Sequence, residues 1–180
     1  MSSVILVTGP ARSGKSEWAE ILVARSGLSA IYIATAQRNP DDRDWQERIE
    51  AHRNRRPASW QTLEISIDVA TTIRSADPGS CLLVDSLGTW IANLLDRDAT
   101  AWEALQTEFL ESLTQTAARV VLVAEETGWG VIPAYPIGRT FRDRLGTLVR
   151  RVGAIAHPVY LVAGGHVLNL SALGSPLDKK

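Results

Sequence analysis

Hydrophobic residues fall along the chain in two alternating patterns: short apolar runs, and longer segments in which apolar positions recur every three or four residues. The apolar runs predict strands over residues 4–8, 31–35, 61–65, 81–85, 119–124, 159–163 and 166–170. The helical spacing predicts helices over residues 15–26, 43–55, 67–75, 87–95 and 137–156, and one more that opens at Thr100. Strands that alternate with helices predict an α/β fold, with a mostly parallel sheet covered by helices on both faces.

Turn and cap residues refine the ends of these elements. Gly164-Gly165 lies between the last two apolar runs, which predicts a tight hairpin and one antiparallel strand at the end of the chain. Thr100 and Glu103 have the spacing of a capping box, which predicts the start of their helix. The loop over residues 127–136 is long and contains two glycines and two prolines, which favours a functional role.

The segment between the first predicted strand and the first predicted helix matches the phosphate-binding pattern G-x-x-x-x-G-K-[ST]. Its residues are Gly9, Pro10, Ala11, Arg12, Ser13, Gly14, Lys15 and Ser16. The N–H groups of such a glycine loop form a concave site for an anion, aided by the positive end of the following helix. Lys15 can reach the β- and γ-phosphates of a nucleotide, and the Ser16 hydroxyl can bind Mg²⁺. A chance match on a surface turn is the alternative, but the flanking strand and helix favour a nucleoside triphosphate site, used now or inherited.

Carboxylates follow two of the other predicted strands. Asp85 ends the strand over residues 81–85, where phosphate-loop proteins place a second acid of the magnesium site; capping the next helix is the alternative. Glu125 and Glu126 follow another strand, and since neighbouring strand residues point to opposite faces, we expect one of them in the site as a metal-shell or base residue and the other to be solvated. Because parallel strands end at one edge of the sheet, the phosphate loop, Asp85 and Glu126 are expected to gather there.

A basic segment over residues 48–56 contains His52 among several arginines. A solvated, charged end of a helix is the usual fate of such a run. The other interpretation is chemical, because neighbouring arginines disfavour a charged imidazolium and bind phosphate oxygens. A neutral His52 would then attack phosphorus and form a phosphoramidate intermediate. His157 and His166 are expected to be structural.

The composition fits a single domain over residues 1–180 and argues against several classes of function. The 19 basic and 20 acidic residues nearly cancel, which argues against a nucleic-acid partner. The single cysteine, Cys81, cannot form an internal disulfide, so we expect a protein of the reducing cytoplasm. The sequence shows no signal peptide, no Cys/His cluster typical of zinc, and no apolar stretch near the ~18 residues of a membrane span.

Further segments accompany the phosphate loop and carry a resemblance to one enzyme family. They are Val7–Ser16, Tyr32–Ala36, Arg48–Pro57 with Trp60, Val84–Leu87 with Trp90 and Asn93–Leu95, Glu126–Pro133, and Arg139–Asp143. In these segments the chain resembles, over nearly its whole length, the bifunctional adenosylcobinamide kinase / adenosylcobinamide-phosphate guanylyltransferases of cobalamin biosynthesis. The phosphate loop is common to many enzymes, whereas the His52 and Glu126–Pro133 segments together are specific to this family.

The resemblance implies two reactions on a phosphate-loop α/β fold of the RecA-like type. ATP or GTP phosphorylates the aminopropanol hydroxyl of adenosylcobinamide, and GTP then transfers GMP to that phosphate through a histidine–GMP intermediate, which gives adenosylcobinamide-GDP and pyrophosphate. It implies catalytic roles for His52, Lys15 and Glu126, Mg²⁺ bound by Ser16 and Asp85, and a homo-oligomer such as a trimer. Nucleotide contacts are implied for residues 9–16 and for Thr35, Ala36, Gln37, Arg53, Arg55, Arg56 and Glu64.

The chain departs from the family pattern in a few places. Many relatives have Asn-Glu where this chain has Glu125-Glu126, Asn-Gln where it has Val149-Arg150, and some have paired histidines where it has Ala51-His52. The changes at Glu125-Glu126 and Val149-Arg150 mean that metal ligation or a subunit contact near these positions can differ from the family pattern. The phosphate loop and His52 match that pattern. Two other functions stay open: a monofunctional small-molecule kinase in which His52 is structural, and a nucleotide-dependent binding module without small-molecule chemistry.

Overall fold

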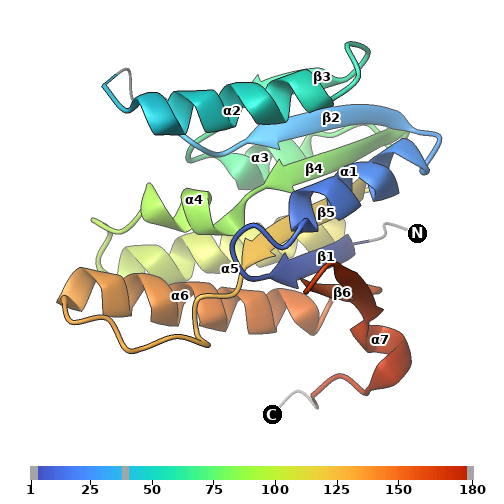
Figure 1. Cartoon of the computed structure of the whole chain (residues 1–180). Coiled ribbons are helices and arrows are strands. Elements are labelled where there is room, and N and C mark those ends of the chain that lie inside the picture. Colours follow the sequence, from blue (N-terminus) through green and yellow to red (C-terminus); the bar gives the residue numbers. More distant parts are fainter. Residues whose placement is uncertain (1–3, 38–40, 178–180) are drawn as a thin grey trace.

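The structure is a computed structural model that describes residues 4–37 and 41–177, without the side chains of residues 44, 45, 48, 49, 51 and 52. Its strands form one sheet of order β3-β2-β4-β5-β1-β6-β7 (Figure 1). Neighbouring strands are parallel except β6 and β7, which are antiparallel. The strands are β1 (Val4–Gly9), β2 (Ser29–Ala34), β3 (Gln61–Glu64), β4 (Ser80–Asp85), β5 (Arg119–Glu125), β6 (Val159–Ala163) and β7 (His166–Asn169).

Helices cover both faces of this sheet. They are α1 (Lys15–Ala24), α2 (Arg43–Arg55), α3 (Val69–Arg74), α4 (Leu87–Ala92), α5 (Ala99–Gln115), α6 (Pro136–Gly153) and α7 (Leu170–Leu173). One face packs against α3, α4, α5 and α6, with Trp90, Phe109 and Leu148 fully buried in that core. The other face packs against α1 through Ala19 and Val23. Burial on both faces explains why the central strands read as continuous apolar runs.

The register of the sheet brings the functional strand ends to one edge. Gly9 at the end of β1 lies beside Glu125 at the end of β5. Asp85 at the end of β4 lies between Val123 of β5 and Ala34 of β2. The backbone N–H of Glu126 donates a 2.9 Å hydrogen bond to the carbonyl of Gly9. The predicted gathering of the phosphate loop, Asp85 and Glu126 at this edge is therefore confirmed.

The N-cap residues of α4 and α5 are not the ones that the sequence suggested. The N-cap of α5 is Asp98, whose Oδ1 accepts a 2.8 Å hydrogen bond from the N–H of Ala101, so the capping box predicted at Thr100 is wrong. Aspartate is a stronger N-cap than threonine, and the helix accordingly begins earlier. The N-cap of α4 is Ser86, which forms a capping box with Thr89. Asp85 is therefore not the cap of α4, and its carboxylate is not used for that purpose.

The predicted hairpin at the end of the chain is confirmed. Gly164 and Gly165 both have positive φ, and β6 and β7 pair in the antiparallel sense. The last strand is shorter than predicted, because the Asn169 side chain accepts a hydrogen bond from Ala172 N–H and starts the short helix α7. The sequence interpretation missed this helix, although asparagine is a favoured N-cap.

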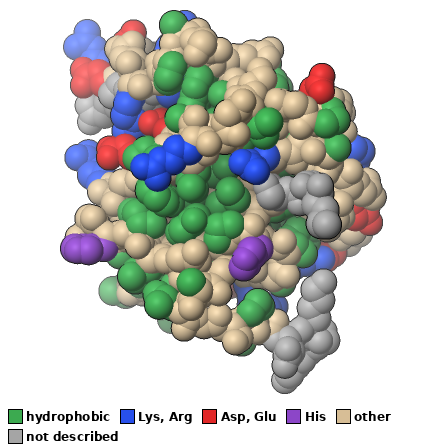
Figure 2. Space-filling model, turned by 90° about the vertical axis from the view of Figure 1, so that its right-hand side faces the viewer, with side chains coloured by type: hydrophobic (Ala, Val, Ile, Leu, Met, Phe, Trp, Pro, Cys, Tyr) green, Lys and Arg blue, Asp and Glu red, His purple; other side chains and the backbone are tan. Residues whose placement is uncertain are grey.

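The predicted α/β class, with helices on both faces and a C-terminal antiparallel strand, is confirmed by this topology. In Figure 1 the strands point away from the face that Figure 2 shows. Hydrophobic side chains gather near the centre of that face, with basic side chains above them and histidines beside them (Figure 2). Among the described helices, none is long and apolar enough to cross a membrane. A single domain over the whole chain stays a prediction.

Candidate nucleotide-binding site

The loop between β1 and α1 is packed tightly against β6. A Cβ atom at Gly9 would lie 2.2 Å from the backbone oxygen of Val162, so a side chain does not fit there. Gly14 has φ 92° and is the N-cap of α1 without a side-chain hydrogen bond to the helix, which leaves the cap free of a competing acceptor. The Lys15 side chain is buried, and its Nζ donates a 3.2 Å hydrogen bond to the carbonyl of Pro10. The lysine side chain thus folds back over the loop that is predicted to bind phosphate.

A cavity of about 750 Å³ opens beside this loop. Its walls come from the loop end, from the carboxyl ends of β2, β4 and β5, from the end of α2 and from β3. The lining residues are Lys15, Ser16, Tyr32, Ala34, Ala36, Arg53, Asn54, Arg56, Pro57, Ala58, Trp60, Thr62, Glu64, Asp85, Ser86, Thr89 and Glu125. The volume suits a small ligand, and the lining combines phosphate-binding and acidic groups with aromatic and small apolar ones. These are the groups that a nucleotide with its metal ion would require.

Asp85 is joined to a tyrosine inside the cavity. The hydroxyl of Tyr32 donates a 3.2 Å hydrogen bond to Oδ2 of Asp85. Burial, and then the charge of Asp85, raise the pKa of Tyr32 far above its ordinary value, so the hydroxyl stays protonated and acts as the donor. The carboxylate is therefore held at the carboxyl end of β4, in the cavity that Ser16 also lines.

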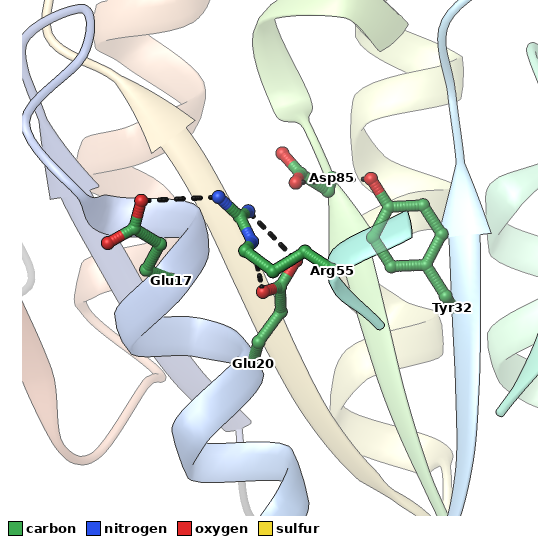
Figure 3. A network of polar contacts seen from close by, with 5 residues as sticks. All are labelled: Glu17, Glu20, Tyr32, Arg55 and Asp85. Carbon is green, nitrogen blue, oxygen red and sulfur yellow. Dashed lines mark hydrogen bonds and ion pairs between the residues drawn. The ribbon is translucent and has the colours of Figure 1, made fainter. Parts of the chain in front are cut away.

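The arginines at the end of α2 have different surroundings. Arg55 binds Glu20 of α1 at 2.7 and 3.0 Å and Glu17 at 3.2 Å (Figure 3). The hydrogen bond to Glu20 raises the pKa of Arg55, which is in any case always charged. Arg53 and Arg56 instead line the cavity. Arg53 and Arg56 can therefore contact a ligand in the cavity directly, whereas Arg55 connects α2 to α1. The nucleotide contacts expected of all three arginines stay predictions.

Glu125, the last residue of β5, and Glu126, which follows it, accept hydrogen bonds from different neighbours. Glu125 lines the cavity and accepts hydrogen bonds from the Ser86 hydroxyl and, at 3.0 Å, from the N–H of Gly88. Glu126 accepts a 2.7 Å hydrogen bond from the Thr8 hydroxyl; it is absent from the lining of the main cavity and, together with Glu125, borders a smaller hollow beside Arg142. Glu125 thus has the better access to a ligand in the main cavity. The catalytic role expected of Glu126 stays a prediction.

The remaining predicted residues are spread around the cavity. Ala36 and Glu64 line it, whereas Gln37 is exposed outside its lining. Thr35 is fully buried; its Oγ1 donates to the carbonyl of Ser86 at 2.8 Å and accepts from the N–H of Ser86 at 2.9 Å, which fixes the turn after β4. The backbone of His52 lies in α2, directly before the cavity-lining Arg53, and its side chain lies outside the described residues.

Each of the other two histidines makes a hydrogen bond with a backbone carbonyl. The N–H of His157 donates to the carbonyl of Val4 at 2.8 Å, and Nδ1 of His166 lies 2.9 Å from the carbonyl of Gly164 in the hairpin. Sequence reasoning gave no role to Tyr32 or Trp60, although both line the cavity. Strand alternation places Tyr32 on the same face as Ala34, and a tyrosine in an apolar run was the available signal.

The sheet, the glycine loop and the cavity at its edge define a phosphate-loop, nucleotide-binding α/β protein. Comparison with known sequences gives the family within that class. The profile of the CobU family, described as cobinamide kinase / cobinamide phosphate guanyltransferase, matches residues 5–170. The chain belongs to this family.

Named relatives agree with this assignment. The chain is 42% identical over 174 residues to the bifunctional adenosylcobalamin biosynthesis protein CobP of Pseudomonas aeruginosa, covering 96% of this chain and 98% of the relative. It is 36% identical over 177 residues to the bifunctional adenosylcobalamin biosynthesis protein CobU of Escherichia coli, covering 90% and 96%. A solved structure from Pyrococcus horikoshii, project PH0250, is similar in fold, with a TM-score of 0.56, 8% identity, and coverage of 93% of this chain and 85% of that one.

Proposed function

We propose that this chain phosphorylates adenosylcobinamide with ATP or GTP and then transfers GMP from GTP to the phosphate through a His52–GMP intermediate. The observation that carries the proposal is that one cavity joins the phosphate loop to the end of α2, the helix that contains His52. Lys15 and Ser16 of the loop line it, and so do Arg53 and Arg56 at the end of α2. Groups for γ-phosphoryl transfer and groups for an α-phosphate are thus available to one nucleotide-binding region.

The kinase half follows from the loop end of the cavity. The substrate hydroxyl attacks the γ-phosphorus and loses its proton, while the nucleoside diphosphate leaves with the electrons of the broken bond. Such a transfer depends on positioning and charge stabilisation more than on covalent chemistry. Lys15 offsets the charge of the transferred group, and Glu126 or Glu125 is the nearby carboxylate available as a base.

The guanylyl half requires a nucleophile. An unprotonated imidazole nitrogen of His52 attacks the α-phosphorus of GTP, and pyrophosphate leaves. A phosphate oxygen of adenosylcobinamide phosphate then attacks the same phosphorus, which restores the imidazole and gives adenosylcobinamide-GDP. Arg53 and Arg56 suit the binding of the phosphate oxygens during both steps, and Tyr32, Trp60 and Ala34 provide an apolar wall for a base.

A magnesium ion suits the oxygen groups on the cavity wall. Ser16 and Asp85 both line the cavity, and hydroxyl and carboxylate oxygens are the ligands that Mg²⁺ prefers. Two such ligands, with water and nucleotide phosphates as the others, are the usual arrangement for this ion. When bound, the ion would neutralise phosphate charge, and Ser16 and Asp85 would hold it.

Asp85→Asn is expected to raise the magnesium concentration needed for half-maximal kinase activity by at least about tenfold and to lower the maximal rate. The amide keeps the shape of the carboxylate and can still accept the Tyr32 hydrogen bond, so the loss of charge is what is tested. A magnesium titration of the kinase rate measures it. Asp77→Asn, in the turn before β4, is the matched control and should behave as wild type. Full activity of the wild-type chain in excess chelator would rule out the magnesium site.

One experiment tests the proposed function as a whole. Purified protein is incubated with adenosylcobinamide and either γ-labelled or α-labelled GTP. We expect γ-label in adenosylcobinamide phosphate, and α-label both in adenosylcobinamide-GDP and in an acid-labile, alkali-stable adduct with the protein. Label transfer from the γ-position alone would make the chain a monofunctional kinase. No transfer from either position, with GTP still bound, would make it a binding module.

We also propose a homo-oligomer, with a trimer as the expected state. Large hydrophobic side chains that are exposed in the single chain support an interface, among them Trp129, Val131, Tyr135, Leu173 and Leu177. Light scattering coupled to gel filtration should give three times the 19.6 kDa chain mass. A monomer at micromolar concentration would contradict this. A cytoplasmic location, in keeping with the buried thiol of Cys81, stays a prediction.

A further inference from the structure

We propose that Tyr32 is a positioning residue that connects the magnesium-binding carboxylate Asp85 to the phosphate-binding guanidinium of Arg56. This inference rests on the proposed function, since it assigns Tyr32 a task within that site. Tyr32 lies in β2, only 5% of it is exposed, and its side chain lines the cavity. Its two ends contact two different functional groups.

The hydroxyl end of Tyr32 fixes the carboxylate. Its 3.2 Å hydrogen bond goes to one oxygen of Asp85, and β2 pairs with β4 in parallel register so that Ala34 lies beside Asp85. Tyr32 therefore reaches Asp85 from the neighbouring strand (Figure 3). A carboxylate that is hydrogen-bonded through one oxygen has its rotation restricted, and outer contacts of this kind tune metal ligands.

The ring of Tyr32 holds the arginine. The guanidinium carbon of Arg56 lies 3.6 Å from the centroid of the Tyr32 ring, well within the range of a cation–π contact. The Nη1 atom of Arg56 is buried and has no hydrogen-bond partner among the described residues. A guanidinium held by a ring face keeps its N–H groups for another acceptor, and the cavity is where an anionic group could supply one.

The neighbouring arginine shows the contrast. The guanidinium of Arg55 forms ion pairs with the carboxylates of Glu17 and Glu20, which fixes the end of α2 beside α1. Arg56 follows directly in the chain and turns to the aromatic ring instead. The α2 end is thus anchored by one arginine and offers the other to the cavity. Tyr32 sets the distance between that cation and Asp85, so a nucleotide would meet both in one arrangement.

Three variants separate the two contacts, with binding of GDP measured by calorimetry with and without Mg²⁺. Tyr32→Phe removes the hydroxyl and keeps the ring; we expect magnesium-free GDP affinity within about twofold of wild type, while the strengthening by Mg²⁺ falls about three- to tenfold. Pentafluorophenylalanine at position 32 keeps the shape of Phe but removes the negative face of the ring; magnesium-free affinity should fall a further two- to tenfold, roughly. In an Arg56→Met background the fluorinated ring should have no further effect.

These measurements distinguish the possible failures. If the wild-type chain does not bind GDP, the proposed nucleotide site is wrong. If wild type binds GDP and Tyr32→Phe shows the full strengthening by Mg²⁺, the link to Asp85 is wrong. If the fluorinated ring weakens GDP equally with and without Arg56, the ring acts on the nucleotide or on the fold, and the link to Arg56 is wrong. Kinase activity measured at saturating Mg²⁺ should be largely restored in Tyr32→Phe, which a general structural defect would not permit.

Discussion

Lys15→Ala is expected to abolish phosphorylation of adenosylcobinamide, with a loss of at least about a hundredfold in rate. Lys15 is the cation of the loop, is 6% exposed, and lines the cavity beside Ser16. Phosphoryl transfer spreads negative charge over the oxygens of the transferred group, and a fixed ammonium in a partly buried site stabilises that charge strongly. Transfer of label from γ-labelled ATP or GTP to adenosylcobinamide measures the effect.

The fold should tolerate this change. The hydrogen bond from Lys15 Nζ goes to Pro10 within the same loop, so its loss breaks no contact between distant elements. Arg25→Ala removes a cation from the C-cap of α1, on the order of 15 Å along the helix from Lys15, and serves as the matched control. That control should keep the wild-type rate. Wild-type kinase rates in a folded Lys15→Ala protein would show that this loop is not the site of phosphoryl transfer.

The parts of this site that could be predicted from the sequence are those that depend on local spacing. The phosphate loop is defined by eight consecutive residues, Gly9 to Ser16, between a strand and a helix, and its strand–helix context needs no tertiary information. Asp85 was predicted from its place at the end of an apolar run, and parallel strands bring such ends together. The sheet topology confirms where the loop and the end of β4 lie, while the roles of Lys15, Ser16 and Asp85 stay predictions.

The parts that could not be predicted depend on which neighbour each side chain meets. Arg55 and Arg56 look equivalent in the sequence, yet Arg55 meets acids of α1 while Arg56 meets the ring of Tyr32. Alternation along β5 predicted that the side chains of Glu125 and Glu126 do not both enter the site. Which of the two enters the main cavity depends on where α4 begins. Gly88 places its N–H against the Glu125 carboxylate, and a Cβ at Gly88 would clash with it at 2.1 Å.

His52→Ala is expected to separate the two activities of the chain. Covalent labelling by α-labelled GTP and formation of adenosylcobinamide-GDP should both be lost, while phosphorylation of adenosylcobinamide should stay within a fewfold of wild type. Guanylyl transfer through a covalent intermediate needs a nucleophile on the protein, whereas γ-phosphoryl transfer to a hydroxyl needs positioning only. Because an imidazolium has no free electron pair for attack, guanylylation should also fall in acid before the kinase does.

The position of His52 in the chain makes this the sharpest test of the proposal. It lies in α2 directly before Arg53 and close to Arg56, both of which line the cavity, and Arg55 fixes that end of the helix to α1. His166→Ala is the matched control, because that histidine lies in the exposed hairpin and should leave both activities unchanged. A protein–GMP adduct that persists in His52→Ala would move the nucleophile to His157 or His166. Loss of both activities in a well-folded His52→Ala protein would instead mean that His52 helps to bind the nucleotide or to hold the end of α2 in place. The basic segment over residues 48–56 would then be better explained as a charged, solvated end of a helix.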